Sequence, residues 1–151
     1  MANNVLVAIL VFAAGALYCV PALLLLVYNG RMLGTLSGLV WMQGYLLDFY
    51  SLVLTHGVLE LSAICIAAGS GLLLGWAVIA PGRLPRRDAL RAAAGDAFGL
   101  LAGAALLLVV AGLIEAYITP HFPAAVRWSV AGVSAVLLAG YLALGGRATA
   151  H

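Results

Sequence analysis

The stretch LTHGVLELS, residues 54–62, places a histidine and a glutamate inside an otherwise uncharged apolar run. His56 and Glu60 are four residues apart, so on a helix they share one face, one turn apart. A second acid, Glu115, interrupts the apolar segment AGLIEAY at residues 111–117. Ionisable side chains are costly among lipid chains, so these three residues should face the interior of the fold.

The composition sets the class of protein. Hydrophobic residues make up 66% of the chain and charged residues 8%, with a mean hydropathy of +1.17, whereas soluble proteins have about 25% charged residues. The 151 residues predict one domain, 1–151, in which helices pack on one another within the lipid bilayer. The net charge of +2 is not spread over a basic surface, so no nucleic-acid partner is expected.

The apolar segments predict an all-α, polytopic transmembrane helical bundle of about four spans. At about 1.5 Å per residue, a helix of roughly 20 apolar residues crosses the hydrocarbon core. The segments of that length are residues 5–28, 50–80, 96–118 and 124–144. Residues 31–49 contain Arg31, Asp48 and an aromatic cluster, which indicates a short re-entrant or interfacial helix. A full crossing by 31–49 is the alternative, and it would move the amino terminus to the other side.

The basic residues predict the orientation in the cell membrane. Four of the seven lie in the loop predicted at residues 81–91, namely Arg83, Arg86, Arg87 and Arg91. By the positive-inside rule this loop is cytoplasmic. A multi-pass protein with four spans then has both termini in the cytoplasm.

Glycines at four-residue spacing predict close helix packing. Small residues on one helix face let backbones approach each other within a membrane. The glycines with this spacing are Gly30, Gly34, Gly38, Gly71, Gly75, Gly95, Gly99 and Gly103. These stripes also favour a homo-oligomer.

Depth along the helices predicts that the ionisable residues meet. If the segments 50–80 and 96–118 are antiparallel neighbours, His56, Glu60 and Glu115 lie about 9, 15 and 7 Å below the outer surface. Asn29, at the outer end of the first span, could reach the same cluster. The cluster is either a ligand or proton site, or a polar network that fixes the bundle.

Metal chemistry is one extension of this cluster. His56, Glu60 and Glu115 could supply three ligands to a divalent metal ion, the one cofactor that the sequence suggests. The spacing of His56 and Glu60 is not the H-E-x-x-H of zinc peptidases. The chain also has no serine or cysteine beside a base in a recognisable nucleophile setting. The expectation is therefore a protein that is not an enzyme.

The same residues carry a family resemblance. The segments are Asn29–Gly30, THGVLEL at 55–61, GSGL at 69–72 and AGLIEAYITP at 111–120. In this order they resemble stage II sporulation protein M and its membrane homologues, whose amino-terminal region is commonly longer than the one here. The resemblance implies an integral membrane protein with no established catalytic activity, and His56, Glu60 and Glu115 fall on motif positions. The sporulation member works with cell-wall hydrolytic partners that remodel peptidoglycan.

Three functions remain open at this point. The first is a non-enzymatic membrane subunit that scaffolds or partners a cell-envelope complex and forms a homo-oligomer. The second is a small cation- or proton-coupled transporter or channel that uses the His/Glu cluster. The third is a metal-dependent intramembrane enzyme. The substrate or partner and the size of the oligomer cannot be read from the sequence.

Overall fold

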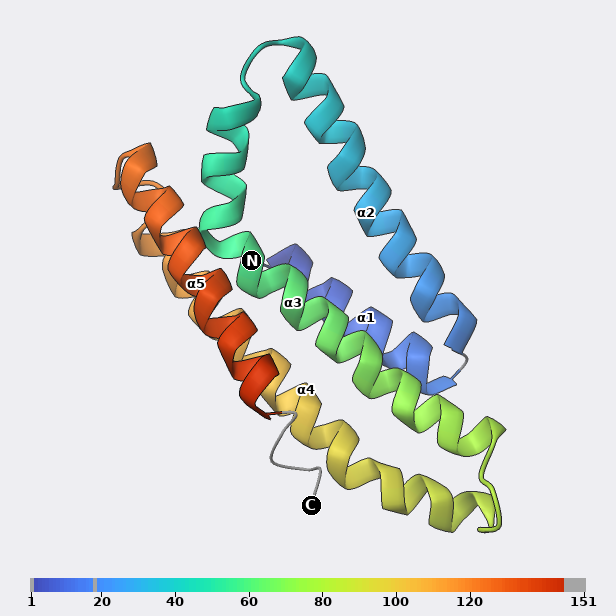
Figure 1. The fold of residues 1–151 in the computed structure, drawn as a ribbon. Coiled ribbons are helices and arrows are strands. Elements are labelled where there is room, and N and C mark those ends of the chain that lie inside the picture. The colour runs from blue at the N-terminus through green and yellow to red at the C-terminus, as the bar shows by residue number, and fades with distance from the viewer. Residues whose placement is uncertain (1, 18, 146–151) are drawn as a thin grey trace.

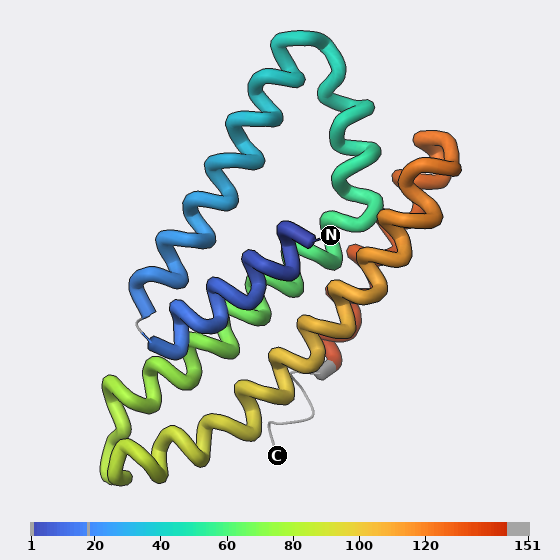
Figure 2. The backbone as a smooth tube through the Cα atoms, turned by 180° about the vertical axis from the view of Figure 1, so that it is seen from behind, coloured from blue at the N-terminus to red at the C-terminus, as the bar shows by residue number. Residues whose placement is uncertain are grey.

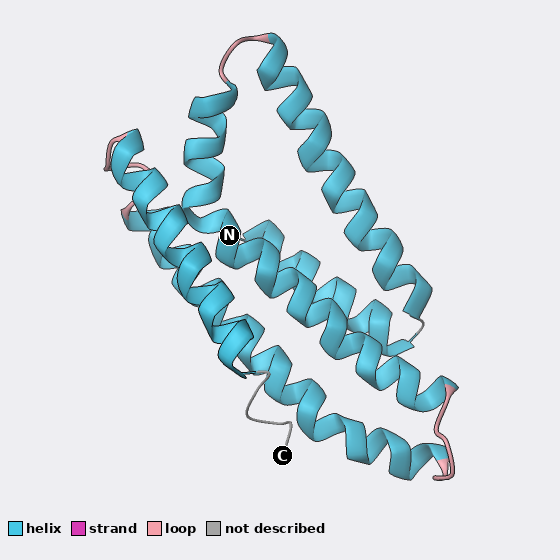
Figure 3. Cartoon of the chain, viewed as in Figure 1, coloured by secondary structure: helices cyan, strands magenta, loops and turns pink. Residues whose placement is uncertain are grey.

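The computed structural model describes residues 2–17 and 19–145, which form five helices and no strand (Figure 3). In chain order the helices are α1 (Ala2–Leu17), α2 (Cys19–Met42), α3 (Leu46–Ile79), α4 (Arg86–Tyr117) and α5 (Ala124–Gly145) (Figure 1). The prediction of an all-α bundle is confirmed. The predicted cytoplasmic positions of the two termini concern Met1 and residues 146–151, which lie outside the described residues.

Four of these helices are long and apolar enough to cross a membrane. They are Cys19–Met42, Leu46–Ile79, Arg86–Tyr117 and Ala124–Leu144, whereas α1 has 16 residues and is shorter. The expected number of long apolar helices is therefore present. The first long helix is not the predicted span at residues 5–28. It is α2, and the helix before it, α1, is short.

The amino-terminal boundaries differ from those expected from the sequence. Residues 5–28 are divided between α1 and α2, and residues 31–42 continue α2 instead of forming a separate helix. Asn29 does not end the helix, because its side-chain amide donates to the Leu25 carbonyl of the same helix at 2.9 Å. In length and composition α2 could cross a membrane, so residues 31–49 form neither the expected interfacial helix nor a crossing of their own.

Helix α2 ends instead at Met42, shortly before a glycine in the left-handed conformation. Gly44 has φ of +82°, which glycine adopts without steric cost. The amide of Gly44 donates to the Trp41 carbonyl at 2.9 Å, and that of Tyr45 donates to the Val40 carbonyl at 3.1 Å. These two bonds form a Schellman motif, which satisfies the last carbonyls of α2 and turns the chain into α3.

Helix α4 begins ten residues earlier than the predicted span at 96–118. Residues 86–95 are mostly arginine and alanine, which are strong helix formers, so the helix starts directly after Pro85. Arg86, Arg87 and Arg91 therefore lie in the first turns of α4, and Arg83 lies in the connection. The Arg86 Nε donates to the Val78 carbonyl at 3.3 Å and joins the two helix ends.

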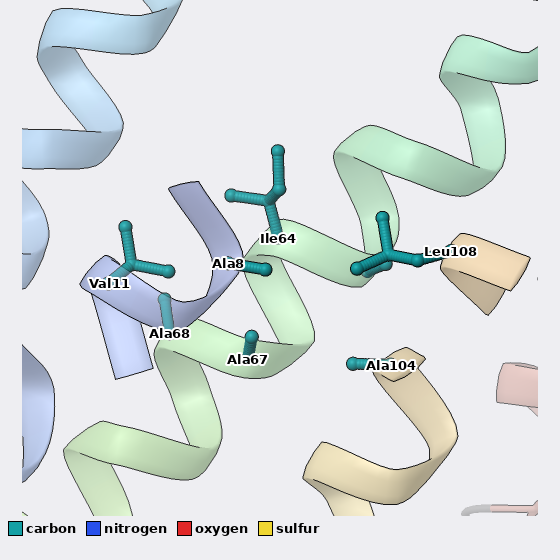
Figure 4. Packing of buried hydrophobic residues seen from close by; sticks show 8 residues of the cluster. Ala8, Val11, Ile64, Ala67, Ala68, Ala104 and Leu108 are labelled. Atoms are coloured by element: carbon teal, nitrogen blue, oxygen red, sulfur yellow. The ribbon is translucent and has the colours of Figure 1, made fainter. Parts of the chain in front are cut away.

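Helix α3 is the centre of the bundle and contacts each of the other four helices. Its neighbours α1 and α4 complete a core of small side chains (Figure 4). The buried members of this core are Ala8, Val11, Ala63, Ile64, Ala67, Ala68, Ala104 and Leu108. Five of these eight residues are alanines, so the helices pack at short range.

The contact between α1 and α3 is close enough to require glycine. A Cβ atom added to Gly71 would lie 2.9 Å from the Cα and carbonyl carbon of Phe12, and one added to Gly75 would meet the carbonyl oxygen of Gly15. A Cβ on Gly15 would lie 2.8 Å from the carbonyl carbon of Gly71. Because the neighbouring atoms are backbone, α1 would have to move to admit a side chain. Figure 2 shows α1 lying alongside α3.

Two further contacts tie α3 to its neighbours. The Ser70 hydroxyl donates to the Ala97 carbonyl at 2.6 Å, which joins buried faces of α3 and α4. Near the connection from α2 to α3, the hydroxyls of Ser37 and Tyr50 lie 3.0 Å apart. Away from these contacts α2 stands apart from α3 (Figures 1 and 2), and Ala22 is the buried residue among its described side chains.

Candidate functional site

His56, Glu60 and Glu115 come together between α3 and α4. Each offers one ligand atom, and these atoms all lie within 4.8 Å of one another. His56 Nε2 lies 4.0 Å from Glu60 Oε2, and the side chains are 16% and 3% exposed, respectively. We call these three residues the polar site. The expected proximity of the three residues is therefore what the structure shows.

The helix geometry explains why the three side chains converge. His56 and Glu60 lie one turn apart on the face of α3 that turns towards α4. Helix α4 runs antiparallel to α3, and Ala104, Leu108 and Ala111 are buried on it. Since Glu115 lies four residues after Ala111, it is on the same face and reaches the level of His56 and Glu60.

Asn4 of α1 is a fourth polar residue at the site, and the sequence analysis did not identify it. Its side-chain amide donates to Glu60 Oε2. The other carboxylate oxygen, Glu60 Oε1, is buried and has no hydrogen-bond partner among the described residues. A polar side chain within the apolar amino-terminal helix was the available signal, because such a residue needs a partner inside the fold.

Thr119, just beyond the end of α4, orients the histidine. Its hydroxyl lies 3.3 Å from His56 Nδ1 and also 3.3 Å from the Ile114 carbonyl. A hydroxyl has a single hydrogen, and the Ile114 carbonyl can only accept. When Thr119 donates to that carbonyl, it accepts from the N–H at His56 Nδ1. Nε2 of a neutral His56 then carries a lone pair on the side of Glu60.

Arg127 of α5 is the cationic side chain that the structure places at the edge of this region. Its Nη1 donates to the Thr119 carbonyl at 3.4 Å. Its Nε is buried and has no hydrogen-bond partner among the described residues. The sequence analysis missed Arg127, because an arginine four residues after Pro123 reads as a residue of the membrane surface. It adds a positive charge next to Thr119, the residue that contacts His56.

The remaining predicted site residues lie elsewhere. Asn29 is on α2 and binds its own helix, so it does not belong to the polar site. Gly71 and Gly75 lie against α1. The other six predicted packing glycines have no atom within 4 Å of an added Cβ, and they are Gly30, Gly34, Gly38, Gly95, Gly99 and Gly103. His121 is exposed, and its Nδ1 lies 3.1 Å from the Tyr117 carbonyl.

The fold and the site define a multi-pass helical membrane protein with a shared polar site between its two longest helices. The family model of stage II sporulation protein M matches residues 1–120, and the chain belongs to that family. The matched region contains α1 to α4 and therefore all three residues of the polar site. Neither a curated protein nor a solved structure matches the chain.

Proposed function

We propose that this protein is a non-enzymatic membrane subunit that assembles with further copies of itself and partners a cell-envelope complex. Membership of the stage II sporulation protein M family supports the class of protein. The observation that carries the proposal is the set of six glycines with four-residue spacing that have no atom within 4 Å of an added Cβ. Each glycine in a helix interior costs about 1 kcal/mol relative to alanine, so an interface with another chain would explain their use.

Helix α2 offers one such surface. Of its 24 residues, Ala22 is the buried one among the described side chains. Gly30, Gly34 and Gly38 form a stripe along the helix, and nothing in the described chain lies against it. A smooth stripe of this kind allows a second helix to approach more closely than lipid chains would require.

Helix α4 offers the second surface. Gly99 and Gly103 line an apolar groove of about 570 Å³ between α4 and α5, together with side chains such as Leu107, Leu138 and Tyr141. In a bilayer a groove of this shape is filled either by lipid or by the helix of another chain. The glycines that line the groove favour the helix of another chain over lipid, because small residues let two helices approach closely.

Leucine substitutions on α4 test the assembly. Gly99→Leu and Gly103→Leu add bulk where the single chain has open space, so the helical content should not change. We expect the cross-linked oligomer in lipid to shift towards smaller species. The matched control is Gly132→Leu on α5, where an added Cβ also has no atom within 4 Å. An unchanged oligomer in both α4 variants would remove these glycines from the interface.

A cation- or proton-coupled transporter is the second candidate, favoured by the convergence of three ionisable side chains within 4.8 Å. Ionisable residues within membrane helices commonly mark ion pathways. This candidate predicts gradient-driven ion or proton flux into liposomes that Glu60→Gln and Glu115→Gln abolish. Equal flux in wild type, in both variants and in empty liposomes would eliminate it.

A further inference from the structure

We propose that His56, Glu60 and Glu115 bind a divalent transition-metal ion, for which Zn²⁺ is the probe of choice. The ligand atoms lie within 4.8 Å of one another. Zinc binds histidine nitrogen and carboxylate oxygen at about 2.0–2.2 Å, so two ligands of one ion are about 3–4 Å apart. The ligand atoms would therefore have to approach one another by about 1 Å to bind one ion.

The unsatisfied oxygen of Glu60 is an independent observation that points to a ligand. Glu60 is 2% exposed, and its Oε1 has no hydrogen-bond partner among the described residues. A buried carboxylate oxygen that lacks a partner is costly, and a metal ion removes this cost by direct coordination. Asn4 donates to Oε2 of the same carboxylate and so holds its orientation.

The surroundings of His56 match those of a metal-binding histidine. Such a histidine usually donates its second ring N–H to an oxygen, which fixes the ring and its tautomer. Thr119 Oγ1 lies 3.3 Å from His56 Nδ1 and serves as this oxygen. Nε2 then points its lone pair to the side of Glu60, from whose Oε2 it is 4.0 Å away. With the proton on Nδ1, Nε2 has no hydrogen to donate, so it makes no hydrogen bond to the Glu60 carboxylate.

Charge and ligand type decide the kind of ion. With two ionised carboxylates and a neutral imidazole, the three ligands carry a charge of −2. This negative charge favours a cation. The imidazole favours zinc and its transition-metal neighbours over magnesium and calcium, which prefer oxygen alone.

Metal content and metal binding of the untagged, full-length protein test this site. Protein purified in detergent is stripped with EDTA, titrated with Zn²⁺ and measured by elemental analysis after desalting. We expect one zinc per chain. Co²⁺ in place of zinc should give visible absorption bands that Zn²⁺ abolishes. His56→Gln, Glu60→Gln and Glu115→Gln should each weaken Zn²⁺ binding more than 100-fold, because changes to groups that only orient a ligand already cost about 10–100-fold.

The controls separate this site from other metal binding. His121→Gln removes an exposed histidine outside the polar site, and Asp48→Asn removes an acid near the start of α3, so both should bind zinc as wild type does. Thr119→Val keeps all three ligands and should weaken binding about 10–100-fold. Absence of saturable zinc binding by the wild type would overturn the proposal, whether or not the variants fold. Zinc binding that persists in folded Glu60→Gln and Glu115→Gln variants would also overturn the proposal. Either result leaves the proposed assembly intact, because that rests on the glycines of α2 and α4.

Discussion

Gly71→Ala is expected to destabilise the bundle by about 3 kcal/mol or more, although it adds a single methyl group. The new Cβ would meet the carbonyl oxygen of Phe12 and lie 2.9 Å from its Cα. Overpacking usually costs about 1–3 kcal/mol when side chains can move aside. Here the opposing atoms are backbone, so the whole of α1 must shift, and the contacts that its Val11 and Gly15 make with α3 are lost. Unfolding in mixed micelles on addition of denaturing detergent measures the loss.

Gly69→Ala is the matched control for this experiment. Gly69 lies on the same helix two residues away, and an added Cβ there has no atom within 4 Å. Alanine is a better helix former than glycine, so Gly69→Ala should leave the stability unchanged or raise it by up to about 1 kcal/mol. Equal stability of Gly71→Ala and Gly69→Ala would contradict the close contact between α1 and α3.

Asn4→Leu is expected to cost about 3 kcal/mol, since it leaves the buried carboxylate of Glu60 without its donor. Asn4 supplies the hydrogen bond to Oε2, and Oε1 already has no partner among the described residues. Losing the partner of a buried charged group costs about 1–3 kcal/mol or more. The same denaturing-detergent titration, performed on metal-free protein, measures the change in the free energy of unfolding.

Two variants test whether the lost hydrogen bond to Glu60 causes this loss of stability. Asn3→Leu changes the neighbouring asparagine, which is exposed, and should have little effect. The double variant Asn4→Leu with Glu60→Met replaces both partners by apolar groups and should recover most of the stability. A double variant as unstable as Asn4→Leu alone would show that the loss comes from packing and not from the unpaired carboxylate.

The polar site could be predicted largely from local spacing. His56 and Glu60 share a helix face because they are four residues apart, and Glu115 meets them because α4 returns antiparallel to α3. Both features follow from the sequence pattern, in which one apolar helix is followed by a short connection and a second apolar helix. The prediction that Asn29 reaches the cluster was wrong, because the position of Asn29 depends on where α2 lies in space and not on spacing along the sequence.

The partners of Asn4 and Arg127 could not be predicted from the sequence, for a physical reason. The apolar run 5–28 contains no charged residue to divide it, so the separate helix α1, and with it the partnership of Asn4 and Glu60, is hidden. Arg127 lies on α5, and its contact with the Thr119 carbonyl depends on the tight turn between α4 and α5. The glycines show the same limit, because their spacing predicts a smooth helix face but not what packs on it. Gly71 packs on α1, whereas an added Cβ on Gly99 has no atom of the described residues within 4 Å.

The division of the glycines into two groups has a consequence for the mechanism of assembly. Gly71 and Gly75 serve the contact of α1 with α3 within the chain, next to the helix that supplies Asn4 to the polar site. Gly99 and Gly103 line the groove between α4 and α5, whose wall also includes Leu59 and Ile114 beside the polar site. On the proposed function, a second chain that fills this groove therefore contacts residues next to the polar site and leaves the contact of α1 with α3 intact.

The most direct test of the proposed subunit is the native mass of the wild-type protein released from lipid nanodiscs. The proposal predicts a particle of at least two chains, with the same number of chains over a range of protein concentrations. A particle of one chain, of about 15.5 kDa of protein, at every concentration and in every lipid composition would contradict it.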